Sequence, residues 1–453
     1  MNGKELVLAA IHNQETPRAP WVPFVGCHAA QLIGTDAESY FKSADHLVAG
    51  ITAAVQRYRP DGIPAVFDLQ LEAEALGCSL QWAKTNPPAV ASHPLETGVS
   101  LSDLTVPDAN DGRFPIVLEA MRRMSASLGA ETALYGLITG PFTLALHLLG
   151  TDIFYNMIDD PDSVQTLMEF TTRVAINTSR LYIEAGMDII GVVDPMTSQI
   201  SPDSFVEFVS PHMTRLFDAI HAMHKPGMLF VCGNARSNIK AMCACHADGL
   251  SIDENIPLDY VRDICRKHNM SFGGNIKLTV TMLFGTPTDN VNDAMTCLSI
   301  GGTKGFLLAP GCDMPFEVPP ENVEAISALV HGEIADFMES SNPLEGVEVI
   351  LPDYSDPRQV NIDVVTLDSE SCAPCQYMME AVYEAANVLG KSIVYKEHKI
   401  KAKEGVVAML KLGVTQVPTI VVDGEIRFVS IIPDDATFHN VLKEAMAVKG
   451  LES

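Results

Sequence analysis

Short apolar runs alternate with longer amphipathic segments along the first three quarters of the chain. Helical periodicity marks the longer segments, among them 113–129, 161–186, 202–224 and 320–338. Parallel strands that each return through a helix produce this alternation. The runs with the length and composition of buried strands are 18–26, 61–68, 133–139, 187–194, 227–233, 249–253, 271–276 and 305–311. Eight such units predict an α/β fold of the closed (β/α)8 barrel type, a TIM barrel.

A second pattern follows the barrel segment. Residues 339–360 are rich in Ser, Asn, Pro and Asp, which interrupts the helical periodicity before a new strand begins. The remaining chain predicts the order β-α-β-α-β-β-α. We therefore expect a barrel over residues 1–340 and a small α/β domain over residues 345–453.

Composition and charge narrow the class of protein further. Hydrophobic residues make up 47% of the 453-residue chain and charged residues 19%, which is typical of globular domains. The formal net charge of -27 argues against a nucleic-acid partner, because binding to phosphates relies on clustered Lys and Arg. We find neither a secretory leader nor an uncharged run of about 18 residues, so we expect a cytoplasmic protein with no membrane partner. Ten cysteines in such a chain predict reduced thiols with metal, redox or core roles.

The ends of the predicted strands carry the candidate chemistry, because TIM-barrel active sites lie where strands lead into βα loops. The residues at these positions are Cys27, His28, Asp68, Thr139, Asp194, Cys232, Asp253, Asn275 and Cys312. We predict that Asp194 and Asp253 are catalytic. We predict that Asp68, Thr139 and Asn275 bind substrate.

A Cys-x-x-Cys motif opens a helix in the second domain. A helix N-terminus stabilises the thiolate of Cys372, which can attack a disulfide, and Cys375 can then resolve the mixed intermediate. Half of a zinc site is the alternative, but no second Cys-x-x-Cys and no His pair lies nearby in the sequence. Pro418 follows Val417 at the position of a cis-proline that faces the thiols, and we predict that it binds substrate. The motif therefore predicts a redox-active pair.

Residues 345–453 resemble a thioredoxin-like domain in this motif, in the segment GVTQVPTIVVDG and in the order of elements, although Ser371 replaces the Trp of thioredoxin. Residues 1–340 resemble the uroporphyrinogen decarboxylase-like superfamily, and within it the corrinoid-dependent methyltransferases that move methyl groups between a corrinoid protein and a thiol such as coenzyme M. The matching stretches are FDLQLEAEALGC (67–78), GPFTLALHLLG (140–150), VVDPMTSQISPDSF (192–205), CGNARSNI (232–239), GLSIDENI (249–256), GGNI (273–276) and APGCDMPFEVPPENV (309–323).

This resemblance implies a zinc site. The thiol methyltransferases bind zinc through a His-x-Cys on one strand and a Cys in a later Pro-Gly-Cys, which activates the acceptor as a metal thiolate. Cys232 and Cys312 stand at the two cysteine positions and are the predicted metal ligands. Phe230 stands at the histidine position, so one expected ligand is missing.

Three interpretations remain open for this site. Zinc can bind through the two cysteines and a replacement ligand, for which the candidates are His147, His28, Asp194 and His246. Alternatively the site works without metal on an acceptor of the tetrahydrofolate type, with Asp194 and Asp253 as its polar groups. In the third interpretation Cys232 and Cys312 are a redox pair served by the C-terminal Cys-x-x-Cys.

Two absences define the predicted reaction and partners. The segment WVPFVGCHAAQLIG contains no Arg or Lys, although a decarboxylase acting on a tetrapyrrole with many carboxylates needs an Arg cluster there. The corrinoid-binding pattern D-x-H-x-x-G is also missing, since His46 directly follows Asp45, so we expect the corrinoid on a separate protein. The sequence thus predicts a methyltransferase for a small thiol or tetrahydrofolate-type acceptor with an attached redox module. The alternative is a thiol-disulfide oxidoreductase whose barrel is only a binding scaffold.

Overall fold

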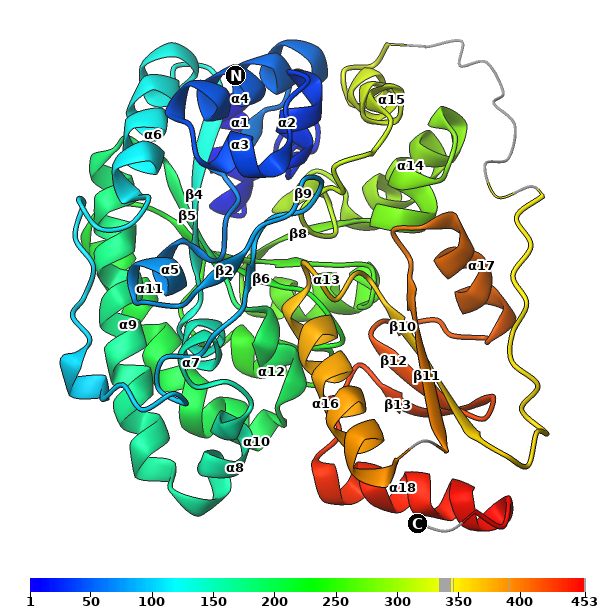
Figure 1. Cartoon of the computed structure of the whole chain (residues 1–453). Helices are drawn as coiled ribbons and strands as arrows, with labels where there is room; N and C mark the ends of the chain where they lie inside the picture. The colour runs from blue at the N-terminus through cyan, green and yellow to red at the C-terminus, as the bar shows by residue number, and fades with distance from the viewer. Residues whose placement is uncertain (334–343, 345, 391, 452–453) are drawn as a thin grey trace. The chain divides into compact units, whose positions relative to one another are not determined.

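The structure, a computed structural model, describes residues 1–333, 344, 346–390 and 392–451. Contacts divide the chain into two units, Met1–Ser340 and Ser341–Ser453 (Figure 1). The predicted domain limits at residues 340 and 345 lie outside the described residues. The helix expected over 320–338 ends earlier, at Val330, and residues 334–338 lie outside the described residues.

The first unit is built on a curled parallel sheet. Within its described residues, seven strands follow one another in the order β1-β4-β5-β6-β7-β8-β9, and each pairs in parallel with the next. Nearly every residue in them is buried, because helices cover the sheet, and this explains their continuous apolar sequences. The strands are β1 (Gly62–Val66), β4 (Ala133–Thr139), β5 (Ile189–Val193), β6 (Gly227–Val231), β7 (Gly249–Ile252), β8 (Ser271–Ile276) and β9 (Phe306–Pro310).

The first predicted strand, which contains Trp21, is not a full strand. Trp21 forms a single parallel bridge with Leu308 of β9. Its carbonyl oxygen accepts a hydrogen bond of 2.9 Å from the N–H of Asp61, which directly precedes β1. Pro20 and Pro23 have no N–H to donate, so a regular ladder cannot form here. The segment nevertheless lies between β9 and β1 and completes the barrel, which confirms the predicted fold class.

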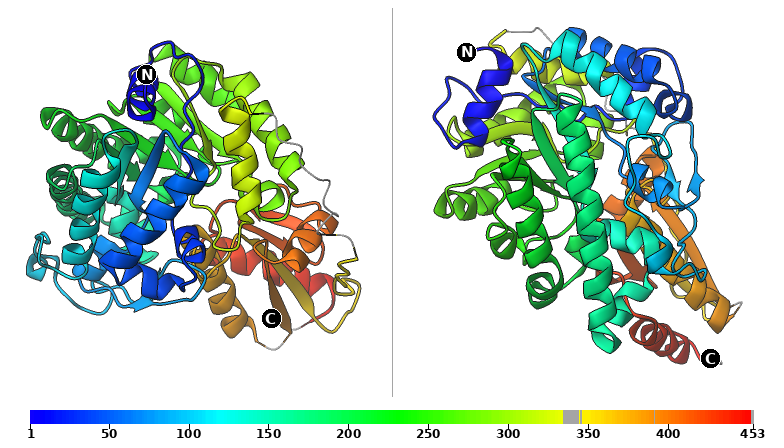
Figure 2. Two further views of the ribbon diagram at one scale, coloured as in Figure 1. Left: turned by 90° about the horizontal axis from the view of Figure 1, so that it is seen from above. Right: turned by 90° about the vertical axis from the view of Figure 1, so that its left-hand side faces the viewer.

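Helices surround this sheet (Figure 2). The predicted helix over 202–224 is present, but a π-helical turn at Phe205–Val209 interrupts it. The helices are α1 (Gly3–Ile11), α2 (His28–Leu32), α3 (Ala37–Phe41), α4 (Ala44–Tyr58), α5 (Leu71–Ala75), α6 (Phe114–Leu128), α7 (Pro141–Leu149), α8 (Asp152–Asp159), α9 (Pro161–Glu184), α10 (Pro202–Ser204), α11 (Ser210–Ala222), α12 (Ile239–Met242), α13 (Leu258–Lys267), α14 (Pro287–Gly301) and α15 (Pro320–Val330). A short hairpin pairs β2 (Leu80–Gln81) with β3 (Ala89–Val90).

Apolar side chains fill the centre of the barrel. Phe24, Phe67, Tyr135, Met228 and Phe230 belong to one buried cluster there. The space left among these side chains and their neighbours is only about 10 Å³, roughly the room for one water molecule. Because the interior is packed, chemistry is confined to the ends of the strands and their loops.

The second unit is a small α/β sandwich. Its sheet has the order β11-β10-β12-β13, with β10 parallel to β11 and antiparallel to β12. The predicted order of elements is confirmed. The strands are β10 (Val360–Thr366), β11 (Ile393–Lys399), β12 (Thr419–Val422) and β13 (Glu425–Val429), and the helices are α16 (Ala373–Leu389), α17 (Lys403–Lys411) and α18 (Asp435–Val448). Across both units, none of the described helices has the length and apolar character needed to cross a membrane.

Candidate functional site

Two cysteines from distant strands meet at the carboxyl end of the barrel. Cys232 directly follows β6, and Cys312 lies just beyond β9. Their Sγ atoms are 2.7 Å apart although the residues are separated by 80 positions. Both are free thiols of intermediate exposure. The barrel thus brings together the two predicted metal ligands.

Asp253 fixes the turn that follows Cys232. Its Oδ2 atom accepts hydrogen bonds from the Gly233 N–H at 2.6 Å and from Asn255 Nδ2 at 2.8 Å. Asn275 supports the same loop, because its Nδ2 donates to the carbonyl oxygens of Asp253 at 3.1 Å and Ile256 at 2.9 Å. Burial raises the pKa of Asp253 to about 6. The structure places Asp253 beside Cys232 and Asn275 against the loop of Asp253, and their catalytic and substrate-binding roles stay predictions.

Glu254 is a member of this site that the sequence analysis missed. Its Oε1 accepts a hydrogen bond of 3.0 Å from the Leu278 N–H. Its Oε2 is buried and has no hydrogen-bond partner among the described residues. A Cβ at Gly311, the residue before Cys312, would lie 2.4 Å from this oxygen, so glycine makes room for the carboxyl group. Burial, and secondly the charge of Asp253, raise the pKa of Glu254 to about 8.

These neighbours keep the thiol of Cys232 protonated. Its pKa is raised well above the ordinary value, first by the contact with the Cys312 thiol and then by burial and the nearby charges of Asp253 and Glu254. The sequence offered one signal for this environment, the adjacent acids in GLSIDENI directly after a strand, of which only the first was assigned a role.

The described residues do not fit a three-ligand zinc centre. A catalytic zinc ion takes three protein ligands. In the described part of the chain, no three His, Cys, Asp or Glu side chains gather as such a set. Phe230, at the position where the resemblance requires a histidine, is buried and packs edge-on against Phe24, with ring centroids 5.3 Å apart.

Two of the candidate replacement ligands are engaged elsewhere. His28 lies between the carbonyl oxygen of Phe316, 3.0 Å from Nδ1, and the hydroxyl of Tyr58, 2.7 Å from Nε2. Burial lowers its pKa to about 4, which keeps the ring neutral. His246 is exposed and its Nδ1 lies 2.8 Å from Asp218 Oδ1. Neither side chain joins the cysteines.

The other two candidates, Asp194 and His147, belong to the helix α7 region. Asp194 Oδ1 accepts from the Thr143 N–H at 2.8 Å and the Thr143 hydroxyl at 2.6 Å, and Oδ2 accepts from the Phe142 N–H at 3.1 Å. The carboxylate therefore caps the helix N-terminus. Burial raises its pKa to about 6. His147 is buried within α7, which lowers its pKa to about 3. The predicted catalytic role of Asp194 is untested, while its observed contacts are those of a positioning residue.

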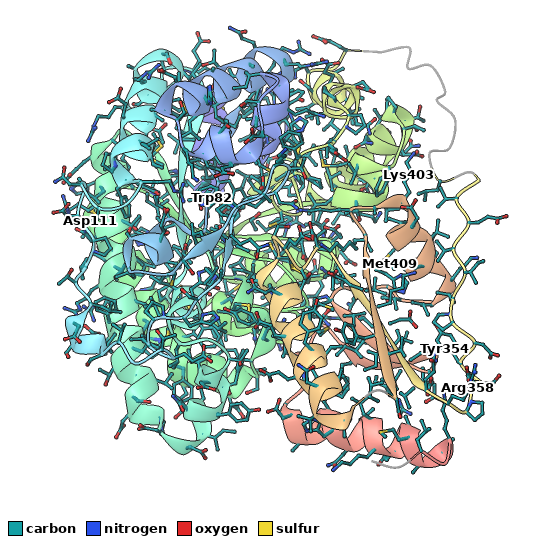
Figure 3. All side chains as sticks on the ribbon, in the orientation of Figure 1. Trp82, Asp111, Tyr354, Arg358, Lys403 and Met409 are labelled. Atoms are coloured by element: carbon teal, nitrogen blue, oxygen red, sulfur yellow. A yellow bond between two sulfur atoms is a disulfide. The ribbon has the colours of Figure 1, made fainter. Side chains whose placement is uncertain are left out.

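Asp68 is bound in a buried ion pair rather than open to a ligand. Its Oδ2 lies 2.6 Å from Arg113 Nη1, and Arg113 Nε lies 2.6 Å from Glu74 Oε2. The guanidinium also stacks on the ring of Trp82, which is labelled in Figure 3, with 4.9 Å between Cζ and the centroid. The predicted substrate contact of Asp68 stays a prediction.

Thr139 ends β4 against a second buried carboxyl group. Its N–H donates to Glu72 Oε1 at 3.1 Å, and its hydroxyl lies 2.7 Å from the carbonyl oxygen of Leu69 and 2.9 Å from Glu72 Oε2. Burial raises the pKa of Glu72 to about 7. The sequence analysis did not single out Glu72, because nothing in LEAEA shows which acid is buried. The predicted binding role of Thr139 is not tested by these contacts.

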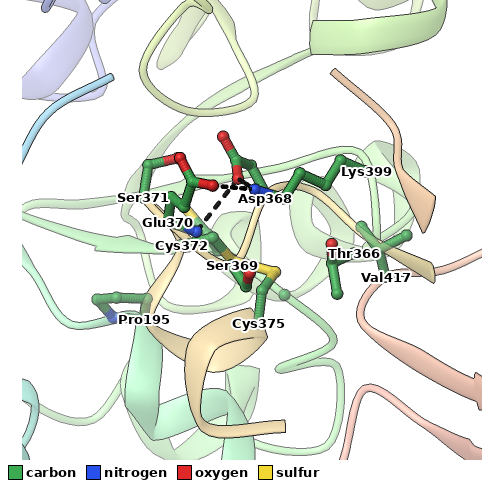
Figure 4. Close-up of a disulfide and its surroundings, with 12 residues drawn as sticks. Pro195, Thr366, Asp368, Ser369, Glu370, Ser371, Cys372, Cys375, Lys399 and Val417 are labelled. Atoms are coloured by element: carbon green, nitrogen blue, oxygen red, sulfur yellow. Dashed lines mark hydrogen bonds and ion pairs between the residues drawn. A yellow bond between two sulfur atoms is a disulfide. The ribbon is translucent and has the colours of Figure 1, made fainter. Parts of the chain in front are cut away.

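The second unit holds the other cysteine pair. Cys372 and Cys375 form a disulfide at the start of α16, with Cys372 at the N-cap and Cys375 buried (Figure 4). Lys399 Nζ lies 2.6 Å from Glu370 Oε1 and 3.0 Å from Asp368 Oδ1 beside this loop. The closeness of the two thiols fits the predicted redox motif.

Pro418, the predicted substrate-binding residue of this unit, is buried directly before β12. Its bond to Val417 is cis, as the sequence suggested, and its carbonyl oxygen accepts a hydrogen bond of 2.7 Å from the Ser430 N–H. Figure 4 shows Val417 among the residues around the disulfide.

A parallel barrel with paired thiols at its carboxyl end, joined to a small domain with a Cys-x-x-Cys at a helix start, defines the class of a TIM-barrel protein fused to a thioredoxin-like module. The family model of uroporphyrinogen decarboxylase (URO-D) matches residues 2–333, and a thioredoxin domain model matches residues 360–443. The chain belongs to the uroporphyrinogen decarboxylase family. Both predicted resemblances are confirmed.

Relatives within this family include several methyltransferases. Methylcobamide:CoM methyltransferase MtbA of Methanosarcina acetivorans is 25% identical over 327 residues, which cover 71% of this chain and 95% of the relative. The methylated-thiol–coenzyme M methyltransferase of Methanosarcina mazei is 30% identical over 288 residues, covering 62% and 73%. The solved structure of a methyltransferase from Methanosarcina mazei superposes with a TM-score of 0.68 at 24% identity, covering 73% of this chain and 99% of that one. The structural likeness shows the barrel fold.

Proposed function

We propose that the barrel is a corrinoid-dependent methyltransferase, which moves a methyl group between a corrinoid on a separate protein and a small acceptor. The observation that carries the proposal is the convergence of Cys232 and Cys312 beside Glu254, at the barrel end where this fold places its chemistry. Relatives named for methyl transfer to coenzyme M support an acceptor of the thiol class. The missing third zinc ligand supports a tetrahydrofolate-type acceptor as the second candidate.

Transfer to a thiol requires a group that takes up a proton. The acceptor S–H loses its proton, its sulfur forms the new bond to the methyl carbon, and the electron pair of the broken methyl–cobalt bond stays on the corrinoid. The ionised form of Glu254 suits the role of proton acceptor, because a pKa raised to about 8 makes its carboxylate a stronger base than an ordinary one and its Oε2 has no partner among the described residues. Asp253 holds the Gly233 turn and so positions Cys232. The residues of this site do not form a set of three zinc ligands, and the transfer described above uses none.

Methylcobalamin provides a direct test. The full chain is incubated with methylcobalamin and either 2-mercaptoethanesulfonate or tetrahydrofolate, and loss of the methyl group is followed in the cobalamin spectrum. We expect demethylation with one acceptor class, and a decrease of about 100-fold in the Glu254→Gln variant. The exposed Glu207 provides the matched control, Glu207→Gln, which retains wild-type activity. Absence of demethylation with every thiol and folate would favour the oxidoreductase alternative.

We further infer that the second unit exchanges thiols and disulfides. Cys372 has partial exposure and sits at a helix N-terminus, which favours its thiolate as the attacking group, whereas the buried Cys375 resolves the mixed disulfide. Of the ten cysteines, all of them described, eight are free. This supports a reducing compartment, for which the cytoplasm is our proposal.

A further inference from the structure

Cys232 and Cys312 lack the third ligand of the zinc site that the thiol methyltransferases have. Their sulfur atoms are nevertheless closer together than those of two unrelated core cysteines. Phe230 stands at the sequence position of the expected third ligand and is packed in the barrel core, and no His, Cys, Asp or Glu of the described residues completes a set. Cys232 and Cys312 nevertheless hold their sulfurs 2.7 Å apart. A disulfide bond measures about 2.05 Å, so bond formation requires only a small movement.

The surrounding backbone fixes this approach. Cys232 follows β6, and the turn after it is tied to Asp253 through the Gly233 N–H. Cys312 follows β9 through Gly311, at which a Cβ would lie 3.0 Å from Asp253 Cα, so the loops touch closely there. Two strand ends of one barrel therefore present the two sulfurs to each other.

Exposure separates this pair from the remaining barrel cysteines. Cys232 and Cys312 are of intermediate exposure, so a reagent can reach them. The six other cysteines that lie outside the disulfide are buried, and they are Cys27, Cys78, Cys243, Cys245, Cys265 and Cys297. Accessible paired thiols are the arrangement that undergoes thiol-disulfide exchange.

We propose that Cys232 and Cys312 form a second thiol-disulfide couple, at the barrel mouth, whose substrates are disulfides of small molecules or of Cys-x-x-Cys proteins. One cysteine attacks a sulfur of the substrate disulfide, the substrate S–S bond breaks, and one substrate thiol leaves with a proton. The second cysteine then attacks the mixed disulfide and releases the other substrate thiol. Two electrons and two protons pass from the pair to the substrate, and the Cys232–Cys312 bond forms. The Cys372–Cys375 disulfide of this chain belongs to the same substrate class.

A redox titration of the full chain tests this couple. The protein is equilibrated in buffers with different ratios of reduced to oxidised dithiothreitol, quenched with acid, alkylated, digested and analysed by mass spectrometry. As the proportion of oxidised dithiothreitol rises, we expect the alkylated peptides of Cys232 and Cys312 to disappear together. A cross-linked peptide, lighter by two hydrogens than the reduced pair, replaces them completely. In Cys312→Ser the cross-link is lost, while Cys232 accumulates as a mixed disulfide with added glutathione disulfide. The control Cys245→Ser, at a buried thiol 3.5 Å from Ser210 Oγ, retains the cross-link.

Two results would overturn the proposal. One is complete alkylation of both barrel cysteines at every ratio, including those at which Cys372–Cys375 is fully oxidised. The other is about one zinc ion per purified chain that protects both cysteines from alkylation and is lost in Cys312→Ser. Fluorescence of the two tryptophans, Trp21 and Trp82, shows whether each variant keeps its barrel, since both lie in the first unit. Methyl transfer is measured separately, so its failure leaves this result intact.

Discussion

The two cysteine pairs reach similar closeness by opposite routes. Cys372 and Cys375 are three residues apart at the start of one helix, and the sequence motif alone identifies them. Cys232 and Cys312 are 80 residues apart, and only the order of strands in a closed barrel brings them together. A local pair is visible from spacing, whereas a distant pair becomes visible only once the fold is assigned.

The surroundings of the two pairs also differ in whether they include cations and a helix N-terminus. Lys401 Nζ donates to the hydroxyl of Ser371, directly before Cys372, and a helix N-terminus points at the same loop. Positive charge of this kind favours a thiolate. The barrel pair instead faces Asp253 and Glu254, whose charges disfavour the thiolate of Cys232. We therefore expect fast exchange at the C-terminal pair and slower exchange in the barrel.

The largest expected effect is at Cys372. Cys372→Ser removes the proposed attacking sulfur. The assay uses protein whose C-terminal cysteines have been reduced beforehand and measures the rate at which it reduces a small disulfide, 5,5′-dithiobis(2-nitrobenzoic acid). We expect this rate to decrease by about 100-fold or more in the variant. The release of thionitrobenzoate measures this rate. Cys375→Ser is the matched control, because it keeps the attacking thiol but traps it as a stable mixed disulfide. Equal rates for Cys372→Ser and wild type would assign the fast exchange to the barrel pair and reverse the comparison.

The second prediction concerns Phe230→His, which we expect to make the barrel cysteine pair, but not the C-terminal pair, bind zinc. Residues 230 and 232 share one face of β6 and its extension, since side chains alternate along a strand. Phe230→His therefore adds an imidazole on the face of Cys232, and we expect about one zinc ion per chain by metal analysis, against none through this pair in wild type. Loss of the ring contact with Phe24 costs the barrel about 1 kcal/mol.

Phe24→His is the control for this variant, because it breaks the same ring contact without placing an imidazole two residues before a cysteine. We expect it to bind no zinc. If Phe230→His also binds none, the pair does not have the geometry of the metal site implied by the resemblance, and its similarity to the thiol methyltransferases ends at the position of the sulfurs.

Much of the fold follows from sequence because buried parallel strands leave a strong signal. Seven of the eight predicted strands coincide with observed ones, as their apolar runs are short and bounded by polar residues. The exception is the segment of Trp21, whose length and composition suit a strand but whose two prolines remove ladder donors. The apolar pattern shows which residues are buried. It does not show that a proline lacks the backbone N–H that a regular strand ladder needs.

The site was less predictable because burial and hydrogen bonding decide what each polar residue does. Asp194 ends a strand as expected, yet its oxygens are used by the N-terminus of α7, a contact across 51 residues. Glu254 lies next to the predicted Asp253 in sequence, but only the fold shows that Gly311 leaves room for its carboxyl group. Position at a strand end identified the neighbourhood, whereas the individual roles depend on packing between loops.

The smallest expected effect is a pH dependence confined to the barrel. Glu72 and Glu254 have pKa values raised to about 7 and about 8 in the folded state, well above the value near 4.3 of an unfolded chain. The folded state therefore holds more protons, and stability falls as pH rises through these values. The lowered pKa values of His28 and His147 act in the other direction, but mainly below about pH 6.5, where most of an unfolded histidine holds its proton.

Between about pH 6.5 and pH 8 the two glutamates outweigh the two histidines, and we expect the free energy of unfolding to fall by about 2 kcal/mol, most of it from Glu254. Urea unfolding followed by tryptophan fluorescence measures the barrel, because Trp21 and Trp82 are the only tryptophans of the chain. Glu254→Gln should flatten the pH dependence, since a neutral amide cannot release the proton, and Glu207→Gln should leave it unchanged. A wild-type barrel equally stable at both ends of this range would show that Glu254 is charged throughout and has an ordinary pKa, and it would then lack the raised basicity on which its proposed role as proton acceptor rests.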